Sequence, residues 1–211
     1  MSVLEQIQEN LIKGKANEVA ELVENALKEG ISPADILNNG MLRGMNIIGA
    51  RFKKNEIYVP EVLIAARAMK AGMKILRPKL VSTGVEPIGT IVIGTVKGDL
   101  HDIGKNLVCM MMEGAGFNVI DAGINIEGEK LVELANENNA SLIGASALLT
   151  TTMINMKDVV EALKASPLNQ KVKLMIGGAP VTQAFADEIG ADAYAPDAAS
   201  AADVAKSFVQ K

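Results

Sequence analysis

A single histidine supplies the most distinctive chemistry in this sequence. The chain has 1 His and 1 Cys among 211 residues, so a zinc site built from His and Cys would lack ligands and no disulfide can form within one chain. His101 follows Asp99 by two residues, and alternate residues of an extended loop point to the same side. A carboxylate beside a metal-ligating imidazole fixes its tautomer and raises its donor strength. One His cannot hold a bare metal ion, but it can supply one axial ligand to a metal that a macrocycle already holds.

Glycines near this histidine leave room for a bulky ligand. Gly104 comes three residues after His101 and would let a large ligand or its tail approach the start of the following helix. Gly177-Gly178 would open a second slot, although such a pair is also typical of a simple turn.

The loop around His101 differs from the nucleotide-binding loops. Five residues separate Gly98 from Gly104, where a phosphate-binding P-loop needs four, and Asn106 stands where that loop has its magnesium-binding Ser or Thr. The dinucleotide fingerprint G-x-G-x-x-G is absent from the sequence as well. Nucleoside triphosphates and NAD are therefore both disfavoured.

A second segment only partly matches a hydrolase motif. The run from Gly144 to Leu148 has the spacing of a nucleophile elbow, but Leu148 replaces its final glycine. A catalytic triad of Ser146, His101 and Asp99 is therefore disfavoured.

Composition and charge exclude several classes of protein. Lys plus Arg number 21 and Asp plus Glu number 25, a formal net charge of −4, which disfavours a nucleic-acid binder that neutralises phosphates. Hydrophobic residues make up 49%, enough for a packed core. The first six residues lack the basic and apolar regions of a signal peptide, and no apolar run approaches the roughly 18 residues of a membrane span. We expect a cytoplasmic protein that binds neither membrane nor nucleic acid.

Apolar residues at spacings of three and four predict four amphipathic helices in the first 80 residues. The first two end near Gly14 and Gly30, Ser32-Pro33 begins the third, and the fourth follows Tyr58. We expect an all-α four-helix bundle at residues 1–80. Residues 81–87 interrupt the pattern and are expected to form a linker.

From residue 88 onward, strands and helices are expected to alternate. The β-branched run 88–96 is typical of a buried parallel strand, and four more rounds of strand and helix follow it. The sequence thus predicts that residues 88–211 form an α/β, Rossmann-like (flavodoxin-like) five-stranded doubly wound parallel sheet. The other strands are expected at 118–120, 142–147, 172–176 and 193–194, and the helices at 102–113, 128–137, 152–165, 182–189 and 199–210. Because ligands bind beyond the carboxyl ends of such strands, the loops of interest are 97–104, 122–126, 148–152, 177–180 and 195–200.

Three motifs in these loops resemble those of cobalamin-binding domains. They are Asp99-x-His101-x-x-Gly104, Ser146-x-Leu148 and Gly177-Gly178, at the ends of the first, third and fourth strands. The helical segment, including residues 58–62, is similar to the cap domain of methyl-carrying corrinoid proteins and of cobalamin-dependent methionine synthase. The resemblance runs from Leu4 to Phe208. The chain thus resembles a corrinoid methyl carrier of a multi-component methyltransferase system.

This resemblance implies a role for each matching position. His101 would be the lower axial ligand of cobalt, in place of the cofactor's own dimethylbenzimidazole base, and Asp99 and Ser146 would form a hydrogen-bond relay from it. The displaced nucleotide tail would thread between the strand ends marked by the second and third motifs. The implied cofactor-binding residues are Gly98, Asp99, Leu100, His101, Asp102, Ile103, Gly104, Ser146, Leu148, Thr150, Gly177, Gly178 and Ala198.

The resemblance also implies a function and a set of partners. A substrate:corrinoid methyltransferase would pass a methyl group to cob(I)alamin, and the resulting methylcobalamin would deliver it to a second methyltransferase acting on tetrahydrofolate or coenzyme M. A reductive activator of the corrinoid would be a third partner. On this interpretation the chain is a corrinoid subunit that is not catalytic by itself, and the choice of methyl donor belongs to its partner.

Two other kinds of cobalamin protein share these motifs. A cobalamin-dependent sensor or regulator can use the same helical cap and sheet, but the DNA-binding ones carry a basic helix-turn-helix domain that this sequence lacks. The cobalamin subunit of a radical mutase shares the His motif, but there the four-helix segment is not expected.

Overall fold

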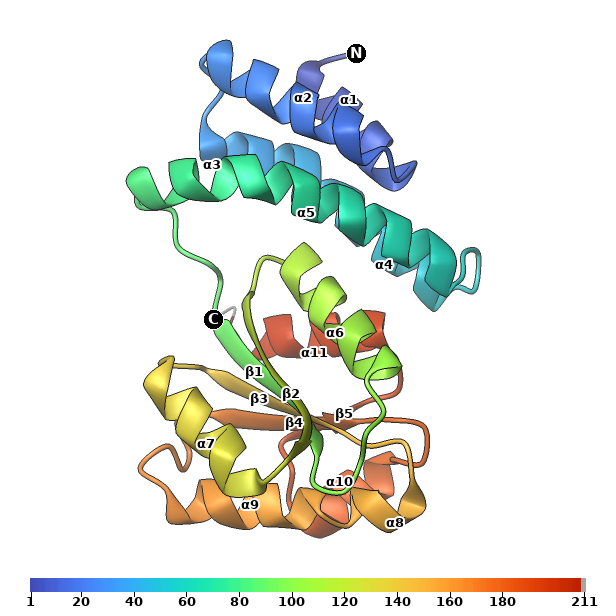
Figure 1. The fold of residues 1–211 in the computed structure, drawn as a ribbon, viewed down its shortest axis with the longest axis vertical. Coiled ribbons are helices and arrows are strands. Elements are labelled where there is room, and N and C mark those ends of the chain that lie inside the picture. The colour runs from blue at the N-terminus through green and yellow to red at the C-terminus, as the bar shows by residue number, and fades with distance from the viewer. Residues whose placement is uncertain (210–211) are drawn as a thin grey trace. The chain divides into compact units, whose positions relative to one another are not determined.

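The computed structural model describes residues 1–209, which form two compact units. One unit comprises Met1–Pro87 together with Gly114–Gly116, and the other comprises Ile88–Glu113 and the chain from Phe117 onward. The first unit is entirely helical and the second has alternating strands and helices (Figure 1). No helix among residues 1–209 is both long enough and apolar enough to cross a membrane.

The helical unit follows the predicted order, with one helix divided into segments. A capping box between Ser2 and Glu5 begins α1, and the Ser32 hydroxyl accepts a hydrogen bond from the N–H of Asp35 at the start of the third helical run. That run continues through a π-helical segment into α4. The elements are α1 (Val3–Ile12), α2 (Ala16–Lys28), α3 (Pro33–Asp35), η1 (Ile36–Leu42), α4 (Arg43–Lys53) and α5 (Val59–Ser82).

The core of this unit contains methionines as well as aliphatic side chains. Met41 and Met69 are buried together with Leu11, Val19 and other apolar residues. A Cβ at Gly72 of α5 would lie 2.7 Å from Cε of Met41 and 3.1 Å from Cγ1 of Val19, so this glycine allows three helical segments to pack closely. Met41 and Met69 therefore contribute to the hydrophobic core, as flexible side chains that fill irregular gaps.

The last helix of this unit is longer than the sequence indicates. Helix α5 extends through Ser82 and thus occupies the first two residues of the predicted linker 81–87. The helix ends there because the backbone turns into the left-handed region at Gly84, with φ of +71°, a conformation that glycine adopts without strain.

The second unit is a five-stranded parallel sheet of strand order β2-β1-β3-β4-β5. This confirms the predicted Rossmann-like fold. Helices α6 and α11 cover one face and α7, α9 and α10 the other (Figure 1). The strands are β1 (Thr90–Val96), β2 (Asn118–Ile126), β3 (Leu142–Ser146), β4 (Lys173–Gly177) and β5 (Ala193–Ala195). The helices are α6 (Ile103–Gly114), α7 (Gly128–Glu137), α8 (Thr150–Met153), α9 (Met156–Ala165), α10 (Gln183–Ile189) and α11 (Ala198–Val209).

This strand order creates a switch point between β1 and β3. The chain leaves β1 toward β2 on one side, then returns to pair β3 with the other side of β1. The loops that follow β1 and β3 therefore leave two adjacent strands in opposite directions. Open α/β sheets bind their ligands at such a point. These two loops contain Asp99, His101 and Leu148.

Two elements differ from the sequence prediction. Strand β2 extends to Ile126, whereas residues 122–126 were expected to be a loop. Its pairing with β1 is irregular between Ile93 and Val96. Asp121, Gly123 and Asn125 are residues typical of turns, so the sequence does not indicate this part of the strand. The predicted helix 152–165 is two helices, α8 and α9, because the chain breaks at 154–155. The other boundaries agree within two residues. Gln210, the predicted end of the last helix, lies outside the described residues.

Candidate cofactor site

The loop after β1 places the imidazole of His101 against a buried carboxylate. Asp99 is fully buried, and its Oδ1 lies 2.7 Å from Nδ1 of His101 while also accepting the backbone N–H of His101 at 3.0 Å. This geometry assigns the Nδ1 proton to the hydrogen bond with Asp99, which leaves the lone pair on Nε2. Nε2 has no hydrogen-bond partner among residues 1–209, and the His101 side chain is 49% exposed. The ring is therefore held from behind and presents a ligand atom outward.

The second oxygen of Asp99 ties this loop to the loop after β3. Oδ2 accepts hydrogen bonds from the Thr152 hydroxyl at 2.6 Å and from the backbone N–H of Leu148 at 2.8 Å. Burial alone would raise the pKa of the Asp99 carboxyl, but the hydrogen bonds from Thr152, Leu148 and His101 together outweigh burial and hold the pKa well below its usual range. Asp99 is consequently a fixed negative charge behind the imidazole.

The structure places Thr152, rather than Ser146, in the hydrogen-bond network of Asp99. Ser146 is the last residue of β3, paired in register with Thr95 and Gly177, and no hydrogen bond among residues 1–209 involves its hydroxyl. Thr152 is the third residue of α8, and its hydroxyl donates to Oδ2 of Asp99. In the described residues Ser146 forms no hydrogen bond with Asp99 or His101, so the relay role expected for it stays a prediction.

Thr152 was missed because the sequence offers three threonines in a row, at positions 150–152. Thr150 and Thr151 are exposed, whereas Thr152 is 7% exposed. The run of hydroxyls after a buried strand could have indicated a polar contact at this point. Only the short helix α8 determines which of the three side chains faces inward.

Exposed apolar side chains lie in the loops that follow β1 and β3. Leu100 is 66% exposed and Ile103 is 79% exposed, and Leu148 and Leu149 across the switch point are also exposed. Contiguous exposed apolar side chains on a globular domain mark a surface that another molecule covers. These side chains offer apolar contacts to a ligand that covers His101.

Among the glycines predicted for the site, Gly177 and Gly178 have close backbone neighbours and Gly104 does not. At Gly178, with φ of +133°, a Cβ would lie 1.8 Å from the carbonyl oxygen of Ala147, so the ends of β3 and β4 approach as closely as only glycine allows. At Gly177 a Cβ would lie 3.0 Å from the carbonyl oxygen of Ala195. A Cβ at Gly104 would meet nothing within 4 Å, which leaves open space beside His101.

The remaining predicted residues have varied positions. The Asp102 carbonyl and side chain accept hydrogen bonds from Asn106 at 2.7 and 3.1 Å, so Asp102 caps α6. Gly98 has a positive φ of +79° at the turn before Asp99. Thr150 begins α8 and is exposed, and Ala198 begins α11 and is buried, so Ala198 offers mainly its backbone to the site edge.

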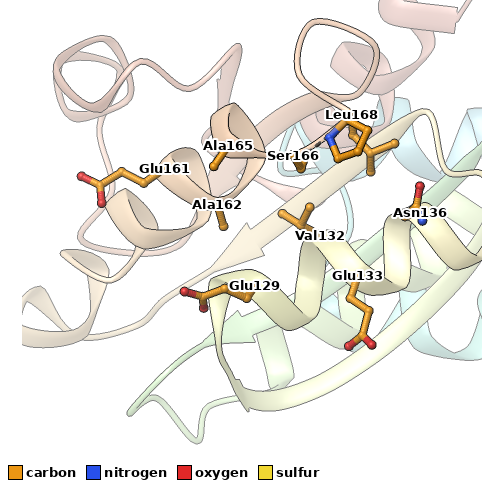
Figure 2. Close-up of a pocket in the computed structure, with 10 residues that line it drawn as sticks. Glu129, Val132, Glu133, Asn136, Glu161, Ala162, Ala165, Ser166 and Leu168 are labelled. Carbon is orange, nitrogen blue, oxygen red and sulfur yellow. Dashed lines mark hydrogen bonds between the residues drawn. The ribbon is translucent and has the colours of Figure 1, made fainter.

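The structure also has a groove away from these residues. It has a volume of about 540 Å³ and lies between α7 and α9 (Figure 2), with Glu129, Glu133 and Glu161 at its rim and Val132 and Leu168 among its apolar residues. None of the predicted site residues lines it.

Comparison with known proteins identifies the two units. Residues 3–77 match one B12-binding domain family and residues 89–203 match another, both described as B12 binding domain. A corrinoid protein from Desulfitobacterium hafniense is 42% identical, covering 100% of this chain and 99% of that protein. Dimethylamine corrinoid protein 1 from Methanosarcina mazei is 44% identical, covering 98% and 96%.

A solved structure agrees with these relatives. The crystal structure of the methanol:cobalamin methyltransferase complex MtaBC from Methanosarcina barkeri contains a chain that aligns with a TM-score of 0.87 at 27% identity. The alignment covers 98% of the present chain and 79% of that chain. The protein therefore belongs to the family of corrinoid proteins of methyltransferase systems, and its cofactor is cobalamin or a related corrinoid.

Proposed function

We propose that this protein carries a methyl group on its corrinoid between two methyltransferases, with His101 as the lower axial ligand of cobalt. The observation that carries this proposal is the pairing of His101 Nδ1 with the buried Asp99, which leaves Nε2 exposed within an apolar surface at the switch point. When bound, the corrinoid would supply a cobalt centre that accepts a methyl group and releases it to a second acceptor.

Asp99 and Thr152 would control the charge and orientation of the imidazole. The Asp99 carboxylate holds the Nδ1 proton, which makes Nε2 the stronger donor. The Thr152 hydroxyl keeps the carboxylate ionised and in place.

The ends of β3 and β4 would hold the displaced nucleotide tail. Their close approach at Gly178 and the open position of Gly104 support a tail path between these strands. Ser146 and Thr150 offer hydroxyls there, and Gly177 and Ala198 offer backbone groups. Ser146 thus remains a proposed contact to the tail, while Thr152 takes its place beside Asp99.

The helical unit, which the sequence predicts at residues 1–80, would serve as a cap. It would cover the methyl-bearing face of the corrinoid. Such a cap excludes water and must move to admit each methyltransferase. The exposed residues between the end of α5 and the start of β1 would provide the hinge.

The partners are inferred from the proposed role, with the relatives indicating the first of them. The identity to a dimethylamine corrinoid protein favours a methylated amine as the methyl source, delivered by a substrate:corrinoid methyltransferase. A second methyltransferase using tetrahydrofolate or coenzyme M, together with a reductive activator, would complete a cytoplasmic system.

Transfer of a labelled methyl group tests this function. The full chain, loaded with cobalamin and reduced, is mixed with dimethylamine carrying a radiolabelled methyl group and a dimethylamine:corrinoid methyltransferase. We expect label to elute with the protein and to move to coenzyme M or tetrahydrofolate when an acceptor methyltransferase is added. Loaded protein that takes up no label from methylamines or methanol, with each matching methyltransferase shown to be active on its own corrinoid protein, would overturn the proposal.

A further inference from the structure

The carboxyl-terminal half of β2 contacts both ends of the loop that contains His101. At the first end, Oδ1 of Asn125 accepts the backbone N–H of Gly98 at 2.7 Å, and the backbone N–H of Asn125 donates to the carbonyl of Asp99 at 3.0 Å. Gly98 and Asn125 both have positive φ, +79° and +54°, a left-handed geometry that glycine and asparagine tolerate. One side chain of β2 therefore fixes the backbone just before the Asp99–His101 pair.

The second contact lies at the start of α6. The ammonium of Lys105, which is 2% exposed, lies 2.5 Å from Oδ1 of Asp121 and 2.8 Å from Oδ1 of Asn106. The same oxygen of Asp121 accepts the N–H of Gly123 at 2.9 Å. A buried cation requires such partners, so Asp121 fixes the end of the loop as Asn125 fixes its beginning.

Two further hydrogen bonds hold the loop from other elements. The Thr95 hydroxyl of β1 donates to the carbonyl of His101 at 2.8 Å, and the Asn155 amide donates to the carbonyl of Lys97 at 2.7 Å. Together with the bond from His101 N–H to Asp99, these contacts satisfy both backbone groups of His101 using protein atoms alone. Protein contacts thus hold the loop backbone on both sides of His101.

We propose that the end of β2 is a brace that sets the His101 imidazole in its ligand orientation before the corrinoid binds, with Asn125 and Asp121 as positioning residues. This inference rests on the proposed role of His101. The bonds of Asn125 and Asp121 reach the loop backbone and Lys105, so both residues act through the loop. Pre-organisation of this kind lowers the ordering cost of binding.

The chain offers well-matched variants for a test. Asn125→Gly keeps the left-handed backbone accessible and removes the Oδ1 acceptor, whereas Asn125→Asp keeps both. Glu127→Gln is a control at the same strand end, because it removes the exposed Lys97–Glu127 ion pair of 3.0 Å without changing a contact to residues 98–101. At the other end of the brace, Asp121→Asn keeps the side-chain shape and removes the charge that pairs with Lys105.

The first measurement uses the cofactor-free full chain. Because His101 is the only histidine, imidazole ¹⁵N signals in histidine-labelled protein report on one ring. We expect the wild type, Asn125→Asp and Glu127→Gln to show one dominant Nδ1–H tautomer, and Asn125→Gly and Asp121→Asn to show averaging of the two tautomers. Wild-type ring signals in both Asn125→Gly and Asp121→Asn would overturn the brace, and backbone amide spectra would establish that the fold is intact.

The second measurement separates this inference from the proposed function. We expect Asn125→Gly to weaken cobalamin binding about 10-fold, as loss of an outer contact to a metal ligand does, while Asn125→Asp and Glu127→Gln bind like the wild type. If His101→Ala leaves the cobalt spectrum unchanged, the proposed function fails. If His101→Ala changes that spectrum while Asn125→Gly binds cobalamin as tightly as the wild type, the brace alone fails.

Discussion

Asp99 connects the two loops of the site at the scale of single residues. Its two oxygens accept hydrogen bonds from His101 on one side and from Thr152 and Leu148 on the other. A buried carboxylate with this many donors is both ionised and immobile. The orientation of His101 therefore depends on contacts between distant parts of the sequence, since Leu148 and Asp99 are 49 residues apart.

Replacement of Thr152 tests this network directly. Thr152→Val keeps the shape of the side chain and removes the hydroxyl, so Asp99 loses a charge-assisted hydrogen bond of 2.6 Å. We expect the free energy of unfolding to fall by about 1–3 kcal/mol, measured by urea denaturation. Thr152→Ser should recover most of that loss, and equal stability of the Val and Ser variants would contradict this role for the hydroxyl.

The charge on Asp99 predicts a pH dependence of stability. Because the pKa of Asp99 is lowered from its ordinary 3.8, ionised Asp99 stabilises the folded state above that pH, and this contribution is lost as the pH falls below it. The difference in unfolding free energy between wild type and Asp99→Asn should therefore be largest above pH 3.8 and shrink below it. Urea denaturation of cofactor-free protein at several pH values measures this difference. A gap that widens on acidification would refute the assignment.

The residue-scale sequence prediction was correct where spacing determined the geometry. The separation of Asp99 and His101 predicts their contact because the loop is short and extended. Thr152 could not be identified, since its neighbours are also threonines and only the direction of α8 distinguishes them. The relay role expected for Ser146 stays a prediction, since its hydroxyl has no hydrogen bond among residues 1–209 and its side-chain direction depends on the strand register.

Strand β2 shows what the sequence leaves undetermined at the scale of elements. Asp121, Gly123 and Asn125 are residues that favour turns, so the segment was predicted to be a loop. In the structure it continues as an edge strand with an irregular register against β1. Two of these turn-type residues, Asn125 and Asp121, contact the His101 loop and α6.

Gly104 provides an element-scale prediction that separates stability from binding. A Cβ at Gly104 would meet nothing within 4 Å and would favour the helix, so Gly104→Ala should leave stability unchanged or raise it by up to about 1 kcal/mol. If a corrinoid occupies the open space, the added methyl group should weaken cobalamin binding about 10-fold. Thermal denaturation of the cofactor-free protein and spectroscopic titration with cobalamin measure the two effects.

A contrasting variant provides the control for this prediction. Gly178→Ala would place a Cβ 1.8 Å from the Ala147 carbonyl oxygen, so it should lower stability as well as binding. Cobalamin affinity that is unaffected by Gly104→Ala would contradict the placement of the ligand beside that residue.

At the scale of the whole molecule, two hydrophobic periodicities predicted the two units. Apolar residues at helical spacing stop before residue 88, and β-branched runs at strand length begin there, because the two units bury their cores in different ways. The end of α5 was misplaced by two residues because the turn at Gly84, rather than the loss of periodicity, ends the helix.

Limited proteolysis tests this division of the chain. Residues 83–89 form a largely exposed segment between α5 and β1, and such segments are cut more readily than helices. A protease of broad specificity should therefore cut within residues 83–89 and release two fragments, identified by mass spectrometry. Initial cleavage within the helices of either unit would contradict the proposed domain boundary.

Electron paramagnetic resonance of the cobalamin-loaded protein in its cobalt(II) state tests the central claim most directly. Because the chain has one histidine, ¹⁵N-histidine labelling changes the nuclear spin of only one possible protein imidazole ligand. If Nε2 of His101 is the axial ligand, the nitrogen splitting should change from a triplet in unlabelled protein to a doublet in labelled protein, and His101→Ala should abolish that change. A triplet that persists in the labelled protein would show that the cofactor's own base occupies the position, and would contradict the account.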